Sequence, residues 1–338
     1  MGIYKIVTSF ISVSLLFVLC SCGVNTEPSR NLIVYVGLYD DLAIKAMESF
    51  EKETGINVTH YRMSSSAILE KIREEKDEPI ASVWYGGPSD TFIQAKSEGL
   101  LQPYISPNAA FISDEYKDTE GYWTGIYVGS IAVVTNRSWL QDIGLTPPQS
   151  WQDLLEPEFR GRITVPNPSH SGTGYTILST LVQLMGEDQA FDYLVKLDEN
   201  INTYTASGSA PGRMVGMGES GVAIMFAHDA LKFYKEGFRD IHISFPAEGT
   251  GYEIGAVGLI KGIENLEEAK AFIDWSLTKQ AQEIGKQMGN YQLLTNEQAI
   301  SPEEAYYLTE SNIISYDKEW SGLHRDYLLK RWQEEVIQ

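Results

Sequence analysis

The chain has few cysteines, few basic residues and few long apolar segments, and each shortage excludes a class of protein. Only two cysteines occur among 338 residues, Cys20 and Cys22. Both lie near the N-terminus, so the rest of the chain offers no disulfide, thiolate zinc site or cysteine nucleophile. Lys and Arg number 26 against 46 Asp and Glu, giving a formal net charge of −20. This acidity argues against nucleic-acid binding, although a buried cleft can still carry a different local charge.

The sequence also lacks the short motifs of common enzymes and metal sites. It contains no His-Glu-x-x-His, Gly-x-Ser-x-Gly, P-loop or EF-hand pattern, and its five histidines have no metal-ligand spacing. We therefore expect a binding protein rather than an enzyme, with no catalytic residue, no metal and no cofactor.

The N-terminus carries the pattern of a secretory signal. Lys5 precedes an apolar run over residues 6–18, which is followed by Leu-Cys-Ser-Cys-Gly at 19–23. This last segment resembles a bacterial lipobox, which places cleavage before Cys22 and lipid on its thiol. The apolar run is shorter than the ~20 residues of a bilayer-spanning helix, so a transmembrane anchor is the less favoured alternative. No second segment is apolar enough to span a membrane.

Cleavage there would remove residues 1–21 as a signal peptide and leave 22–30 as a lipidated tether. The removed segment contains one Lys and no acidic residue, so the charge would change from −20 to −21. We expect the mature protein outside the cytoplasmic membrane, at the cell surface or in the periplasm, held only by its acyl chains.

Apolar periodicity predicts alternating strands and helices. Strands are expected over 31–36, 56–61, 81–84, 163–165 and 222–226, and helices over 41–54, 67–75, 91–97, 174–184 and 188–197. This alternation is typical of an α/β protein with parallel, doubly wound sheets. Two further strand-like segments, 127–136 and 252–260, are expected to cross between two lobes and form a hinge. The first lobe would then contain 31–130 and 254–338, and the second 131–253.

Four segments carry a family resemblance. Residues 51–58 (Glu-Lys-Glu-Thr-Gly-Ile-Asn-Val), 95–101, 167–176 and 267–283 are similar, in this order, to landmarks of bacterial extracellular solute-binding proteins of the type II class. The loop 167–176 (Asn-Pro-Ser-His-Ser-Gly-Thr-Gly-Tyr-Thr) is similar to that of the ferric-iron, phosphonate and sugar-phosphate branch. The resemblance implies a two-lobed type II periplasmic-binding-protein fold, with two doubly wound sheets joined by a two-strand hinge, that captures a solute between the lobes for an ABC-type permease.

Three polar turns precede predicted helices and are candidates for anion binding. A helix N-terminus presents unpaired N–H groups and partial positive charge, hydroxyls add donors, and glycine permits close approach. The candidate residues are Ser64, Ser65, Ser171, Gly172, Thr173, Ser207 and Ser209. Ordinary helix capping is the alternative for each turn. Arg62 and Arg213 stand beside two of the turns, and either can supply the full charge or point to solvent.

Carboxylates and aromatic residues are candidates for the organic part of a ligand. His228 and Asp229 follow an apolar strand, although Asp229 alone also suits a helix cap, and Glu253 lies in the second crossing strand. The resemblance implies sugar contacts from such a His-Asp pair and a later glutamate. Tyr39, Trp84 and Gly86, which end or follow predicted strands, are further candidates for ligand contact. The two aromatic rings suit stacking on a sugar, with core packing as the alternative.

Iron is the less favoured ligand. Iron-binding relatives carry adjacent tyrosines where this chain has His228 and Asp229, a histidine near Tyr39 and a carboxylate near Gly86, and these are absent here. We expect a small anionic solute, with a sugar phosphate favoured. Ferric iron, a phosphonate and a polyamine are alternatives, because aromatic residues with carboxylates also suit a cation.

We expect a monomer whose partners are the solute and ABC permease subunits. A membrane sensor kinase is the alternative protein partner, since some relatives report a solute to a two-component system. The lipid anchor would be the only contact with a membrane, and no nucleic-acid partner is expected.

Overall fold

The computed structural model describes residues 31–337, without the side chains of 307–310. The predicted signal peptide, Cys22 and the tether 22–30 lie outside the described residues. Within residues 31–337, no helix is long and apolar enough to cross a membrane.

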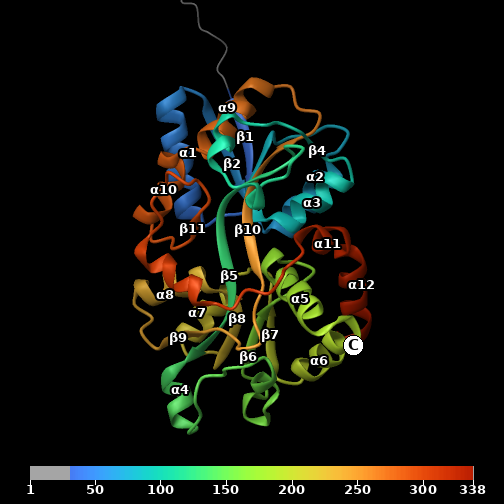
Figure 1. Cartoon of the computed structure of the whole chain (residues 1–338), viewed down its shortest axis with the longest axis vertical. Coiled ribbons are helices and arrows are strands. Elements are labelled where there is room, and N and C mark those ends of the chain that lie inside the picture. The colour runs from blue at the N-terminus through green and yellow to red at the C-terminus, as the bar shows by residue number, and fades with distance from the viewer. Residues whose placement is uncertain (1–30, 338) are drawn as a thin grey trace, which may run out of the picture.

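Strands and helices alternate along the described chain (Figure 1). The first part contains β1 (Asn31–Val36), α1 (Asp40–Thr54), β2 (Asn57–Arg62), α2 (Ser65–Glu74), β3 (Val83–Pro88), α3 (Ser89–Ser97), β4 (Leu101–Gln102), and the 3-10 helices η1 (Pro107–Phe111) and η2 (Asp114–Tyr116). The middle contains β5 (Thr124–Asn136), α4 (Arg137–Asp142), η3 (Gln152–Leu155), η4 (Pro157–Phe159), β6 (Ile163–Pro166), α5 (Gly172–Met185), α6 (Glu187–Asp198), β7 (Ile201–Thr205), α7 (Ala210–Gly216), β8 (Val222–Phe226), α8 (Ala227–Glu236) and β9 (Ile241–Ser244). The last part contains β10 (Tyr252–Ile260), α9 (Leu266–Ser276), α10 (Lys279–Gln287), β11 (Leu293–Leu294), η5 (Glu303–Glu310), α11 (Lys318–Leu323) and α12 (Arg325–Glu335). The α/β architecture predicted from the sequence is confirmed.

The first sheet is covered by helices on both faces. β1 lies between β2 and β3, parallel to both. Its Val34 and Val36 face a core with α1, α9 and α10, whereas Tyr35 faces the core that contains residues of α2 and α3. Side chains of a strand point alternately to opposite faces, which explains why this strand is almost continuously apolar.

The second sheet is built in the same way. β6 pairs with β7 and β8 in parallel. In the second half of β5, Ile131 and Val133 pack toward α5, α6 and α12, whereas Ala132 and Val134 pack toward α7 and α8. Each lobe therefore has its own doubly wound core.

β5 and β10 connect the two sheets. Thr124–Ser130 of β5 pairs antiparallel with β10, and from Ile131 onward β5 pairs antiparallel with β8 instead. β10 has the predicted bounds, whereas β5 begins three residues earlier than the predicted crossing. In Figure 1 the two strands run side by side through the centre of the molecule.

The C-terminal helices differ from the predicted division of the chain. Residues 254–338 were all expected in the first lobe, but Leu328, Trp332 and Val336 of the α12 region lie in the second-lobe core. α11 packs against α3 of the first lobe, and α12 against α5 and α6 of the second. The reason is that α12 places its large apolar side chains at helical spacing on one face, which the second-lobe helices cover. The other boundaries remain a prediction.

Candidate ligand-binding site

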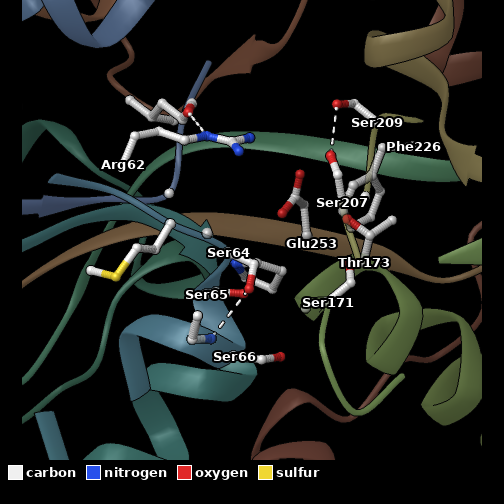
Figure 2. A pocket seen from close by; sticks show the side chains of 18 of the residues that line it. Arg62, Ser64, Ser65, Ser66, Ser171, Thr173, Ser207, Ser209, Phe226 and Glu253 are labelled. Atoms are coloured by element: carbon white, nitrogen blue, oxygen red, sulfur yellow. Dashed lines mark hydrogen bonds between the residues drawn. The ribbon is translucent and has the colours of Figure 1, made fainter. Parts of the chain in front are cut away.

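A cavity of about 680 Å³ lies between the lobes. Figure 2 shows Glu253 between two groups of side chains, with Arg62 and Ser64–Ser66 on one side and Ser171, Thr173, Ser207 and Ser209 on the other. The predicted site residues that line it are Tyr39, Ser64, Ser65, Ser171, Gly172, Thr173, Ser207, Ser209, His228, Asp229 and Glu253. Tyr127 of β5 lines the cavity as well, so residues from both lobes and from both crossing strands meet at one cavity.

Two of the polar turns are helix caps that also face the cavity. The Ser64 side chain accepts a hydrogen bond from the Ala67 amide at 3.2 Å, and Ser171 accepts from the Gly174 amide at 3.4 Å. The Ser64 hydroxyl also donates across the cleft to the His170 carbonyl oxygen at 2.7 Å. The capping alternative is therefore correct for these two serines, and their neighbours Ser65 and Thr173 add further hydroxyls to the cavity lining.

The third turn does not cap its helix. Ser209 has no side-chain capping bond, and its hydroxyl lies 3.4 Å from that of Ser207. A Cβ on Gly208 would lie 2.1 Å from Thr173 Oγ1, and one on Gly172 would lie 2.0 Å from Ser65 Oγ. Glycine at these two positions therefore lets the turns approach each other closely.

Arg62 supplies positive charge, whereas Arg213 does not. Arg62 Nε donates to the Leu38 carbonyl oxygen at 3.1 Å, and its guanidinium lies toward the cavity (Figure 2). The prediction that Arg213 binds the ligand is contradicted by its place in the structure. Its guanidinium lies 5.6 Å from the Phe233 ring centroid and 5.9 Å from that of Phe238, outside the cavity lining. It lies beyond the first turn of α7 and packs toward α8.

His228, Asp229 and Glu253 form a buried polar group. His228 Nε2 lies 3.2 Å from Asp229 Oδ1 and 3.6 Å from Glu253 Oε1. α8 begins at Ala227 after the N-cap Phe226, so Asp229 lies in the first turn and is not the cap. Burial, and then the neighbouring Asp229 and Asp90, raise the pKa of Glu253 well above its usual range. The ring of Phe226 stacks on His228 with centroids 5.5 Å apart.

Of the three candidates near the ends of β1 and β3, Tyr39 lines the cavity, whereas Trp84 and Gly86 do not. Trp84 is fully buried and stacks on Phe92 with centroids 4.0 Å apart, while its Nε1 donates to the Gly86 carbonyl oxygen at 2.9 Å. The predicted contacts of Trp84 and Gly86 with the ligand are therefore wrong, and the next residue, Gly87, lines the cavity instead. The side chain of Trp84 points to the face of the sheet that α3 covers. The sequence alone does not indicate this face, because a strand that is apolar throughout has no alternation of polar and apolar residues. Tyr39 does line the cavity, and burial and Asp229 raise the pKa of its hydroxyl.

Several lining residues were not predicted from the sequence. These are Gly37, Leu38, Met63, Gly87, Pro88, Tyr127, Ser169, His170, Ala206, Phe226, Asn290 and Gln292, among others. Arg62, which was predicted beside the first serine turn, and Ser66, which belongs to that turn, also line the cavity. Tyr127 lies at the start of the predicted crossing segment 127–136. Asn290 and Gln292 follow α10 with no motif to mark them. Over residues 31–337, no three His, Cys, Asp or Glu side chains are grouped to hold a metal ion.

The comparisons with known proteins agree with this architecture. Residues 80–305 match the family described as bacterial extracellular solute-binding protein. An uncharacterized protein of Haemophilus influenzae is 34% identical over 96% of this chain and 97% of its own length. The periplasmic binding protein AfuA of Actinobacillus pleuropneumoniae, with exogenous fructose-6-phosphate bound, is 37% identical with a TM-score of 0.88, over 91% of this chain and 99% of that one. The periplasmic binding protein P5PA is 32% identical with a TM-score of 0.87, over 90% and 99%.

Proposed function

We propose that this chain, which belongs to the family of bacterial extracellular solute-binding proteins, captures a small phosphorylated organic solute, with a sugar phosphate favoured, for an ABC-type importer. The observation that carries the proposal is one cavity in which hydroxyl-bearing helix N-termini and a cation face buried carboxylates. A phosphate alone needs only the helix N-termini and the cation, and a neutral sugar needs only the carboxylates. A sugar phosphate uses both sets of residues.

The anionic part of the ligand is assigned to residues of both lobes. Arg62, the first turn of α2 and the first turn of α5 each offer N–H or O–H donors to the same space. Arginine and helix N-termini both favour phosphate. In an otherwise acidic protein, this is where an anion finds a favourable local field.

The hydroxyl-bearing part is assigned to Asp229 and Glu253. A buried carboxylate without a full set of partners is costly, and sugar hydroxyls donate hydrogen bonds to carboxylate oxygens. The similarity to a binding protein with fructose-6-phosphate bound supports this assignment. Ferric iron fits less well, because this chain has His228 and Asp229 at the positions where iron-binding relatives carry adjacent tyrosines.

We further propose that Cys22 carries a lipid anchor and that the lobes close around the ligand. The hydrogen bond from Ser64 to His170 joins the two lobes across the cavity, as in a closed form. Permease subunits are the proposed partners, with a membrane sensor kinase as the alternative. Neighbouring genes distinguish the two, since an importer requires permease and ATPase genes and a sensor requires a kinase and a response regulator.

Calorimetry on the wild type and Asp229→Asn tests the proposed ligand. The wild type should bind fructose 6-phosphate more tightly than inorganic phosphate and bind fructose weakly. A charged hydrogen bond contributes about 1.5–3 kcal/mol, so Asp229→Asn should weaken fructose 6-phosphate binding by roughly ten-fold or more. Binding of inorganic phosphate should change little. Ser209→Ala should weaken both, and the exposed Asp192→Asn on α6 is the control.

Two results would contradict the proposal. Equal losses for both ligands in Asp229→Asn would remove the division between phosphate and hydroxyl contacts. Tight binding of a polyamine, lost when Asp229 or Glu253 is neutralised, would favour the cationic alternative. Native mass spectrometry of the purified protein identifies any solute that is carried through purification.

A further inference from the structure

A buried arginine lies directly behind two helix N-termini of the cavity. Arg325, the first residue of α12, is 2% exposed. Its Nη2 donates to Ser66 Oγ at 2.6 Å, in the first turn of α2. Its guanidinium lies 4.2 Å from the ring centroid of Tyr175, in the first turn of α5. Ser66 itself lines the cavity, so one cation contacts the starts of two helices that belong to opposite lobes.

The charge of Arg325 is only partly neutralised. Its Nη1 lies 4.0 Å from Oδ1 of Asp90, and neither of these two buried atoms has a hydrogen-bond partner among the described residues. The other Asp90 oxygen accepts from Thr176 Oγ1 at 3.2 Å. A buried ion pair in which one nitrogen and one oxygen lack hydrogen-bond partners is a poor source of stability. A role in stability alone therefore does not account for this arrangement.

The chain holds Arg325 at this place from both sides. Gly322 in α11 packs so tightly on α3 that a Cβ there would lie 2.6 Å from Ile93 Cβ. Tyr175 donates through its hydroxyl to the Ser321 carbonyl oxygen. α12 continues into the second-lobe core through Leu328 and Trp332. The junction between α11 and α12 is thus fixed to both lobes.

We infer that Arg325 is a positioning residue for phosphate capture, which sets the separation of the α2 and α5 N-termini and adds its positive charge to theirs. This inference rests on the proposed function, because it requires an anionic ligand. The guanidinium need not touch the ligand, since charge in a buried, low-dielectric setting acts over a longer range than at the surface. Asp90 opposes this effect because its carboxylate lies beside the same cation.

The test compares Arg325→Met, Arg325→Lys and Asp90→Asn by calorimetry with fructose 6-phosphate and inorganic phosphate. Arg325→Met should weaken both ligands on the order of ten-fold, the size of one charged interaction. Arg325→Lys should recover part of the loss, because lysine keeps the charge without the planar fork. Asp90→Asn should bind at least as tightly as the wild type, since it removes an opposing charge.

Arg331→Met is the matched control. Arg331 lies on the same helix, and its guanidinium likewise lies 4.2 Å from an aromatic ring centroid, that of Phe191. It pairs with Glu187, and neither Glu187 nor Phe191 lines the cavity, whereas Arg325 contacts the lining residue Ser66. The Arg331→Met variant should lose stability without losing affinity. If Arg325→Met bound both ligands like the wild type, or if affinity fell together in Arg325→Met and Asp90→Asn, the inference would be wrong. A wild type that bound neither ligand would instead overturn the proposed function.

Discussion

Gly129 determines whether His228 can reach Asp229 and Glu253. In the pairing of β5 with β10, Gly129 lies opposite Glu253. A Cβ at position 129 would lie 2.2 Å from Nδ1 of His228 and 2.5 Å from its Cε1. The imidazole would have to retreat by roughly 1 Å or more to reach ordinary contact distance. The 3.2 Å contact of His228 Nε2 with Asp229 does not survive such a shift.

Gly129→Ala should therefore reduce both stability and affinity. Overpacking a core costs about 1–3 kcal/mol. Each kcal/mol lowers Tm by roughly 2–4 °C in a domain of about 150–250 residues, and by somewhat less in a longer chain such as this one. Displacing His228 from its contact with Asp229 should also weaken fructose 6-phosphate binding by about ten-fold or more. Thermal unfolding and calorimetry measure the two effects independently, so the stability result does not depend on the identity of the ligand.

Gly285→Ala is the control for this substitution. A Cβ at position 285 in α10 would meet no atom closer than 3.4 Å, and alanine is favoured over glycine within a helix by about 0.5–1 kcal/mol. This variant should keep or slightly gain stability. Wild-type stability and affinity in Gly129→Ala would refute the steric argument, since the ring would then have space that the structure does not show.

Three other predictions concern closure, pH and the anchor. Lys232→Met should weaken ligand binding several-fold in calorimetry. Lys232 of α8 donates hydrogen bonds of 2.9 Å across the cleft to Asp41 and to the Met288 carbonyl oxygen, and the substitution removes both. Unchanged affinity would exclude a role of Lys232 in closure. Burial and Asp229 raise the pKa of Glu253, so the native state holds this proton more tightly than the unfolded chain and loses stability as pH rises above about 4.3. Glu253→Gln should therefore gain Tm relative to the wild type from about pH 5 to about pH 8, and a constant difference would contradict the raised pKa. Cys22→Ser should release the protein from the membrane fraction, and retention there would contradict the lipobox interpretation.

The parts of the fold that follow local rules were predictable from the sequence. The continuous apolar run of β1 matches a strand buried on both faces. α1 carries Asp40 and Asp41 in its first turn and is followed by the C-cap Gly55, whose φ of 70° favours glycine. β10 has the predicted bounds because an apolar strand with small residues is recognisable by composition alone. The serine turns were recognisable as helix starts by the same kind of local signal.

The orientation of side chains and the long-range contacts were not predictable. Trp84 and Gly87 lie three residues apart in one strand, and only the packing of α3 decides that the first is core and the second faces the cavity. Arg325 lies 259 residues from Ser66 in the sequence, and nothing near either residue indicates their contact. The core contacts of α12 also depend on which lobe has an apolar surface that no other element covers. Tertiary packing determines these contacts, and local sequence patterns do not record it.

The place of Glu253 links ligand chemistry to the hinge. Its partner across the ladder is Gly129, next to the point where β5 leaves β10 and pairs with β8. A ligand favours closure only by the difference between its affinities for the closed and open forms. A buried carboxyl group on a crossing strand contributes to this difference, because its need for hydrogen-bond partners grows as closure removes water. A solute whose hydroxyl donates a hydrogen bond to Glu253 and whose phosphate contacts both lobes should therefore stabilise the closed form more than a sugar or a phosphate alone.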